Sequence, residues 1–89
     1  MKAVITVVGK DSVGIISRVA AECTSYNVNI SEITQSVLSE YFVMIMLVDI
    51  DDISSDFDAF ASAMEKLGHE NNLEIRTMHE DIFNSMHEI

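Results

Sequence analysis

Residues 9–30 read GKDSVGIISRVAAECTSYNVNI, which predicts a strand end, a polar loop, a helix and the start of a second strand. Asp11 or Ser12 is predicted to cap this helix, because their side chains accept hydrogen bonds from the free N–H groups of a first turn. Gly14 would then lie inside that turn, where glycine costs about 1 kcal/mol relative to alanine. Its presence indicates either a neighbouring chain or ligand that needs room, or simply a tight strand-to-helix connection. A ligand at a helix start is expected to be anionic, such as a carboxylate or phosphate.

The composition indicates one small and strongly acidic domain. The chain has 89 residues, 48% of them apolar, and a formal net charge of −10. The acidic residues are concentrated in the second half, where residues 49–89 contain eleven acidic and two basic side chains. Such a surface repels phosphate backbones and anionic lipids, so neither nucleic acid nor a membrane is an expected partner. A domain of this size is near the lower limit for a single core, which favours association with a partner.

The single cysteine and the N-terminal segment both favour a cytoplasmic location for the protein. Cys23 alone excludes an intramolecular disulfide and any cluster that needs several thiolates, which fits a reducing cytoplasm. It falls on the apolar stripe of the first helix, so a buried side chain is expected rather than a reactive thiol. The apolar run at residues 3–9 is too short for a signal sequence or a membrane span, so we expect a mature, soluble, cytoplasmic protein.

The hydrophobic periodicity predicts the order β-α-β-β-α-β. Strands are expected at residues 2–8, 27–38, 41–50 and 73–78, with helices at residues 12–26 and from about residue 55 to residue 68 or slightly beyond. The first and third strands are apolar on both faces, and the second and fourth are more polar. Two interleaved right-handed crossovers then give an α+β, ferredoxin-like fold. Its antiparallel sheet has the strand order 4-1-3-2, with two helices on one face only.

The acidic segment after the third strand does not fit a calcium loop. Counting from Asp49 places Ile53 and Phe60 where oxygen ligands belong. A solvated turn that leads into an acidic helix start is the simpler interpretation, with Ser54 or Ser55 as the helix cap.

The tail at residues 79–89 is predicted to be a short amphipathic helix appended to a domain at residues 1–78. Its apolar stripe must be buried somewhere, and the sheet face without helices needs the tail, a second subunit or both, so we expect a homodimer or a higher oligomer. The stripe consists of Ile82, Phe83, Met86 and Ile89. His79 and His87 lack the spacing of metal ligands, and no metal or cofactor is expected.

Several functions of this fold are disfavoured by the residues present. A ferredoxin or metal chaperone needs more cysteines, and an RNA-binding version needs a basic surround. Ser-His-Asp and paired-carboxylate arrangements are not evident, so no enzymatic activity is expected.

The opening motif resembles that of the ACT domain, a small regulatory module that senses amino acids and related metabolites. The residues that carry the resemblance are DSVGI at 11–15, followed by a helix, and then Asn29-Ile30 with Ile33 and Gln35. The resemblance covers residues 2–78. It is closest to the ACT modules of the glycine cleavage system repressor and of formyltetrahydrofolate deformylase, and to bacterial proteins of one ACT domain alone. Val13 stands where family members often have proline.

The resemblance implies a dimer whose ligand lies between the first loop of one subunit and the entry to the second strand of its neighbour. On this sequence the ligand-binding residues would be Asp11, Ser12, Val13 and Gly14, facing Asn27 and Asn29. Helix N–H groups would hold a carboxylate, and the amides would orient an amino group. The expected function is an amino-acid sensor that modulates a partner protein. The alternative is a structural or protein-interaction module without a ligand, in which the two asparagines serve only their turn.

Overall fold

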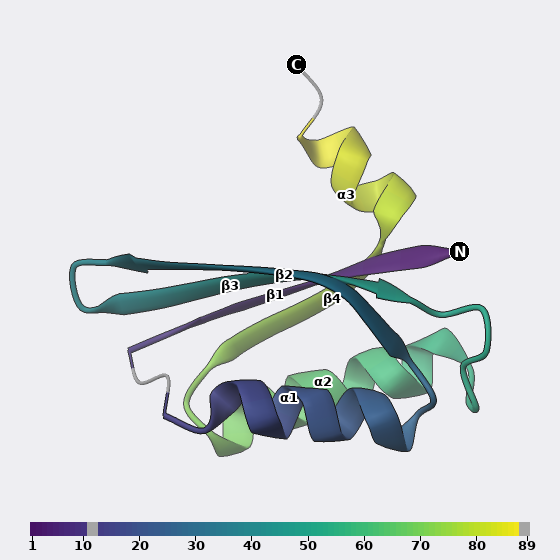
Figure 1. The fold of residues 1–89 in the computed structure, drawn as a ribbon, viewed down its shortest axis with the longest axis horizontal. Coiled ribbons are helices and arrows are strands. Elements are labelled where there is room, and N and C mark those ends of the chain that lie inside the picture. The colour runs from purple at the N-terminus through teal and green to yellow at the C-terminus, as the bar shows by residue number, and fades with distance from the viewer. Residues whose placement is uncertain (11–12, 88–89) are drawn as a thin grey trace.

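The computed structural model describes residues 1–10 and 13–87, which form a four-stranded sheet with three helices. Two helices cover one face of the sheet and the third rises from the opposite side (Figure 1). Along the chain the elements are β1 (Lys2–Gly9), α1 (Ile15–Ser25), β2 (Asn29–Leu38), β3 (Tyr41–Asp49), α2 (Phe57–Glu70), β4 (Glu74–His79) and α3 (Glu80–Met86). The sheet is antiparallel with the order β2-β3-β1-β4, so the predicted ferredoxin-like fold is confirmed.

The central position of β1 and β3 follows from their composition. In β1 the side chains of Ala3, Ile5 and Val7 are fully buried under α1 and α2, and Val4 on the other face is also buried. A strand with apolar residues on both faces is stable only between two neighbours. β2, in contrast, is exposed along nearly its whole length, as expected of an edge strand.

The main core lies between the sheet and the pair α1–α2. Phe60 of α2 is fully buried and meets Tyr26 edge to face, with ring centroids 5.5 Å apart. Val19 and Cys23 of α1 fill the adjoining space and are also fully buried. Each such side chain contributes roughly 1.5–3 kcal/mol on burial, so this layer supplies most of the stability.

The first helix begins later than the sequence predicts. α1 starts at Ile15 rather than near Ser12, and its N-cap is Gly14 in the left-handed conformation with φ +73°. The prediction that Gly14 lies inside the first turn is therefore wrong. Glycine is required there because L residues with a side chain adopt positive φ only at a cost. The predicted caps, Asp11 and Ser12, lie outside the described residues.

The second helix has a different cap than expected, and it ends slightly beyond Gly68, within the range that the sequence allowed. Asp56, not Ser54 or Ser55, caps α2, since its Oδ1 accepts the Ala59 N–H at 2.7 Å. Gly68 does not end the helix, which continues to Glu70. A Cβ at Gly68 would lie 2.7 Å from the Leu73 carbonyl oxygen, so glycine permits the close approach of the chain entering β4.

The tail helix forms, but it buries no residue completely. α3 follows β4 without a linker, and Ile82 and Met86 are 52% and 65% exposed. Phe83 stacks on His87 with ring centroids 4.3 Å apart, and Ile89 lies outside the described residues. Within one chain the predicted burial of the tail stripe is thus not achieved.

Candidate functional site

The described part of the first loop presents exposed backbone at the start of α1. Val13 is 85% exposed, and nothing lies within 4 Å of the position that a Cβ on Gly14 would take. The left-handed backbone of Gly14 fits the tight strand-to-helix connection, and the open space beside it also leaves room for a neighbouring molecule. Asp11 and Ser12, the other two residues predicted from this loop, are outside the described residues.

The first turn of α1 is suited to a negatively charged group. Gly14 has no side chain with which to cap the N–H groups of this turn, and its carbonyl accepts the Arg18 N–H at 3.2 Å. Helix starts carry a partial positive charge, to which the guanidinium of Arg18 adds one turn later. Since Arg18 is exposed, a carboxylate can approach it from solvent.

Arg18 also lines a shallow groove that the sequence did not reveal. Its Nη1 donates to Asn71 Oδ1, and Asn71 Nδ2 donates to the Leu67 carbonyl at 2.8 Å, which fixes the amide. The groove has a volume of about 390 Å³ and is lined by Val13, Ile15, Arg18, Glu70, Asn71, Asn72 and Leu73. Arg18 could have been suspected from its place four residues after Gly14. Asn71 could not, because only the tertiary fold brings it there.

Asn27 and Asn29 lie at the opposite end of α1. Asn27 adopts a left-handed conformation with φ 58°, and its Nδ2 donates to the Asp52 carbonyl at 2.8 Å. The neighbouring Tyr26 carbonyl accepts the Ser54 N–H at 2.9 Å. Asn27 therefore has a structural role in the turn, as the alternative interpretation expected. Asn29 is exposed and pairs with Asp49 across the β2–β3 ladder.

The two halves of the predicted site do not meet within one chain. α1 has 11 residues, and such a helix is roughly 16 Å long. Gly14 stands at its first end and Asn27 follows its last. Gly14 and Asn27 are therefore too far apart for one small ligand to touch both within a single chain.

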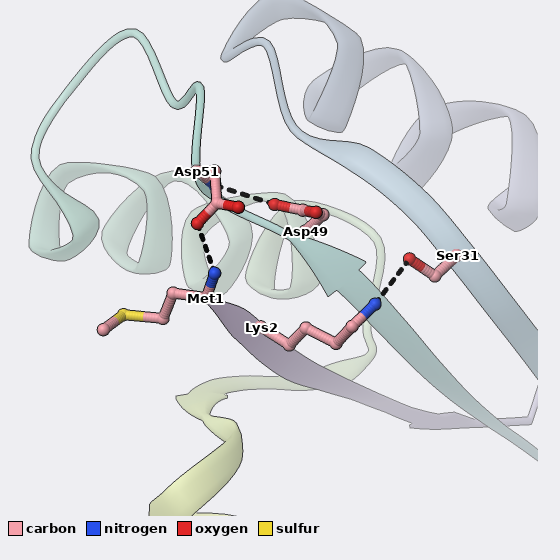
Figure 2. Close-up of polar contacts among 5 residues, drawn as sticks. All are labelled: Met1, Lys2, Ser31, Asp49 and Asp51. Carbon is pink, nitrogen blue, oxygen red and sulfur yellow. Dashed lines mark hydrogen bonds and ion pairs between the residues drawn. The ribbon is translucent and has the colours of Figure 1, made fainter.

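The end of the sheet near Asn29 is rich in charged groups (Figure 2). The N-terminal ammonium pairs with the Asp51 carboxylate, and Asp49 Oδ1 accepts the Asp51 N–H at 2.8 Å. The hydrogen bond from the terminal ammonium to the Asp51 carboxylate raises the pKa of the amine and lowers the pKa of Asp51. Lys2 Nζ donates to Ser31 Oγ at 3.3 Å. Asp49 and Asp51 thus serve local structure.

Cys23 and His79, which could in principle be reactive, are both packed against other residues. Cys23 is fully buried, and desolvation raises the pKa of its thiol to about 11, which suppresses the reactive thiolate. His79 stacks on Phe57 at a centroid distance of 4.1 Å. Among residues 1–10 and 13–87 there is no group of three or more His, Cys, Asp or Glu that could hold a metal ion. Of the helices in this described part, none is long and apolar enough to span a membrane.

Comparison with known proteins matches the chain to one family along most of its length. The family model of the ACT domain matches residues 2–78. A UPF0237 protein of Clostridium perfringens is 48% identical over 89 residues, which is the full length of both chains. The solved structure of an ACT domain protein from Streptococcus pneumoniae is 40% identical, covers 93% of each chain and superimposes with a TM-score of 0.82.

Two further structures contain this unit within longer chains. A formyltetrahydrofolate deformylase from Pseudomonas syringae is 25% identical with a TM-score of 0.77, and the match covers 88% of this chain but 27% of the deformylase. A structure described as a putative glycine cleavage system transcriptional repressor is 23% identical with a TM-score of 0.70, covers 85% and 43% of the two chains, and shows the fold alone. The resemblance drawn from the DSVGI motif is confirmed.

Proposed function

Because this chain belongs to the ACT domain family, we propose that it is a regulatory module that binds an amino acid between two copies and thereby modulates a partner protein. ACT domains are regulatory modules, and the matched unit is about a quarter of the deformylase chain. The prediction that the chain is not an enzyme is confirmed by this family membership. We take residues 1–78 as the regulatory module and residues 79–89, which include α3, as an appended tail, in a cytoplasmic protein.

The observation that carries the proposal is the opposite polarity of the two ends of α1. At its start, backbone N–H groups that Gly14 itself cannot cap and the Arg18 guanidinium favour a carboxylate. Beyond its end, Asn29 lies beside Asp49, whose carboxylate and whose neighbour Asp51 favour a cation. An α-amino acid carries one charge of each sign about 3 Å apart, so it suits a site in which the start of one α1 faces the Asn29 end of another copy.

The β2 edge offers a way to form that site. Val37, Phe42 and Gly9 pair across the sheet, so β2 ends where β1 enters the first loop. β2 begins at Asn29, at the opposite end of the sheet. If two β2 edges pair antiparallel about a two-fold axis, the Asn29 of each copy moves to the first-loop end of the other. The exposed stretch after the bulge between Ile30 and Glu32 is available for such pairing.

In this arrangement the ligand would contact Asp11, Ser12, Val13 and Gly14 of one copy, with Asn27 and Asn29 of the other. Asn27 contributes least, because its Nδ2 is already bound to the Asp52 carbonyl. Binding at the junction would favour one relative orientation of the two copies. A partner protein that recognises that orientation would then respond to the amino acid concentration.

A thermal-shift screen against each of the twenty common amino acids tests the proposal. An amino acid present at ~100 times its dissociation constant should stabilise the protein by about 2.7 kcal/mol. For a domain of this size such a gain raises the melting temperature by roughly 10 °C or more. Asn29→Ala should abolish the shift without changing the melting temperature of the free protein. Asn84→Ala on α3 is the matched control and should retain the shift.

Mixing two variants tests whether the site is shared between copies. Ser12→Ala and Asn29→Ala should each fail to bind alone. After mixing and exchange of subunits, a hybrid dimer has one site free of both substitutions, so about half of the hybrids' binding capacity should return. Absence of any shift across the twenty amino acids would contradict the proposal and favour the alternative, an interaction module without a ligand, which the structural role of Asn27 already supports.

A further inference from the structure

The face of the sheet opposite α1 and α2 carries an apolar patch that the described residues 1–10 and 13–87 leave partly exposed. The cross-strand pairs place Val8, Val43, Ile45, Leu47 and Met78 on this face, in register with Val4 and Thr6. We call these five residues the open-face patch. Val8 is 38% and Ile45 40% exposed, whereas Val4, nearer to α3, is 4% exposed. The patch is therefore most exposed toward the end of the sheet that lies away from α3.

α3 stands on the same side of the sheet but leaves the patch open. It rises from the end of β4, beside the start of β1, and points away from the strands (Figure 1). No linker residue separates β4 from α3, so the helix cannot fold back over Val8 and Ile45 without unwinding. Its base contacts β1 and β4 and Phe83 is half-buried, but Ile82 and Met86 remain exposed. One chain thus presents two partly exposed apolar surfaces on one side.

We propose that these two surfaces pack against each other between copies of the chain. In the proposed interface two sheets face each other about a two-fold axis that reverses the strand direction, and each α3 covers the exposed end of the other copy's open-face patch. The dimensions agree, because the seven residues of α3 rise by about 10 Å and sheets that pack face to face are about 10 Å apart. Such an interface is closed and uses the same residues twice.

The charge distribution favours a second copy as the occupant, even though the chain carries a net charge of −10. The charged side chains that share the open face are nearly balanced: Lys2, Glu32, Asp49, Glu74 and Arg76. Arg76 and Glu74 form an ion pair at 3.1 Å. Of the remaining acidic residues, six lie on α2 and the loop before it, whereas Glu80 and Asp81 lie at the base of α3. The sheet part of the open face is therefore nearly neutral, so two copies repel each other little where their sheets meet.

The available area also points to a partner that itself brings an apolar helix. Four strands about 4.8 Å apart and six residues long present roughly 400 Å² of projected area per copy. A standard interface buries about 800 Å² on each partner. The sheet face is too small by itself, and α3 enlarges it only if the partner buries α3 at the same time. A second copy does both, because it offers a sheet for this α3 and an α3 for this sheet.

This surface is separate from the β2 edge, so the inference does not depend on the proposed amino-acid site. A chain that uses both the edge and the open face would assemble as four copies. Loss of the open-face contact alone would leave a pair joined at the β2 edges. The two proposals can therefore fail independently.

Sedimentation analysis at about 50 μM tests the interface. Met86→Asp and Ile45→Asp each place a carboxylate in the proposed contact, and each should halve the particle mass of the full chain. Met86 is 65% exposed, so its substitution does not threaten folding, which circular dichroism would verify. Ser62→Asp adds the same charge on exposed α2 and should leave the mass unchanged. If both variants keep the parent's mass, or the parent is a monomer, the proposal is wrong and the open face serves a different molecule or none.

Cysteine cross-linking tests the direction of packing. Val8→Cys combined with Met86→Cys should form disulfide-linked pairs under mild oxidation, because each α3 lies over the other copy's Val8. Each single variant should remain uncross-linked, since the two-fold axis keeps identical positions at opposite ends. The natural Cys23 is fully buried and does not interfere. Equal cross-linking in the single variants would overturn the proposed arrangement.

Discussion

On one face of the sheet, α1 and α2 bury Ile5, Val7 and Phe60 completely, while on the other face Val8 and Ile45 remain about 40% exposed. Both faces are apolar at their centre, and both are built by the same two strands, β1 and β3. The difference lies in what stands above them: two amphipathic helices on one side, and on the other a single helix that points away (Figure 1). Apolar composition alone does not determine which surface becomes a core.

This contrast assigns different tasks to the two faces. The covered face is closed within the chain, so its contacts hold the fold together at any protein concentration. The open face can be closed only by another molecule, so its contacts contribute to stability through mass action. Substitutions on the two faces should therefore differ in size and in their dependence on concentration.

The largest effect is expected for Phe60→Ala on the covered face. Removing a fully buried phenyl ring leaves a cavity and costs about 3–5 kcal/mol, independent of protein concentration. Met86→Ala on α3 should cost less than about 0.5 kcal/mol at 0.5 μM, as surface substitutions do. Its cost should grow at 50 μM if α3 is buried between copies. Urea unfolding at both concentrations measures this. A concentration-dependent cost for Phe60→Ala, or an equally large cost for Met86→Ala at 0.5 μM, would contradict the assignment of different tasks to the two faces.

The second prediction compares thiol reactivity on the two sides. Burial raises the pKa of Cys23 from its ordinary value of 9.0 to about 11. At pH 8 its thiolate fraction should be roughly 100-fold lower than that of an exposed thiol, since each pKa unit is a factor of ten. Iodoacetamide should label Cys23 slowly. A cysteine introduced by Met86→Cys, in a Cys23→Ala background, should react as fast as a free thiol in solution. Equal labelling rates would show that the covered face opens readily.

The same pKa shift gives a pH dependence with a definite sign. Above pH 9 the unfolded chain releases the Cys23 proton while the folded chain retains it, so the unfolded state is favoured as the pH rises. The stabilising contribution is complete below pH 9 and is lost between pH 9 and about 11. Cys23→Ala should lack this decline, which urea titrations at pH 8 and pH 10.5 would measure.

The third prediction concerns two glycines that serve different purposes. At Gly68, in the covered layer, a Cβ meets the Leu73 carbonyl oxygen at 2.7 Å, so Gly68→Ala should cost about 1–3 kcal/mol by overpacking. At Gly14 a Cβ meets open space, but φ is +73°, so Gly14→Ala should cost roughly 1–2 kcal/mol through backbone strain. Substitution by asparagine distinguishes backbone strain from overpacking, because asparagine tolerates positive φ but is larger than alanine. Gly14→Asn should regain much of the loss in melting temperature, and Gly68→Asn should lose more.

The sequence predicted the strand order and both long helices because these depend on periodicity. Apolar residues on both faces of β1 and β3 identified the central strands, and alternation in β4 identified an edge. The start of α1 was missed because the left-handed conformation of Gly14 has no signature in a hydrophobic pattern. The cap of α2 was missed because Ser54, Ser55 and Asp56 are all acceptable caps, and only the backbone geometry selects one.

The candidate site was less predictable than the fold. Asn27 matched the expected motif, but its amide donates to the Asp52 carbonyl, a contact between two turns that are distant in sequence. The contact of Arg18 with Asn71 joins residues 53 positions apart and depends on how α1 lies beside the turn into β4. The exposed stripe of α3 follows from the absence of a linker after β4, which sets the direction of the helix. These features depend on tertiary geometry rather than on local pattern.

A small effect of the opposite sign is expected at Thr77, a polar residue on the face of β4 that lies against the helices. Thr77 pairs with Ile5 of β1, and its Oγ1 is buried without a hydrogen-bond partner among the described residues. Thr77→Val replaces this hydroxyl with a methyl group of similar shape and keeps the β-branched side chain that strands favour. Removing an unsatisfied polar atom should stabilise the protein by about 1 kcal/mol, measured by urea unfolding.

Thr34→Val is the matched substitution on the open face, where Thr34 is exposed and pairs with Ile45. It creates the same change of hydroxyl to methyl without relieving a buried group, so the stability of the isolated chain should stay within about 0.5 kcal/mol. What it changes is the apolar area beside the open-face patch, which should strengthen association at high concentration. If Thr77→Val is destabilising instead, its hydroxyl has a partner such as a bound water, and this part of the covered face is less dry than its burial indicates.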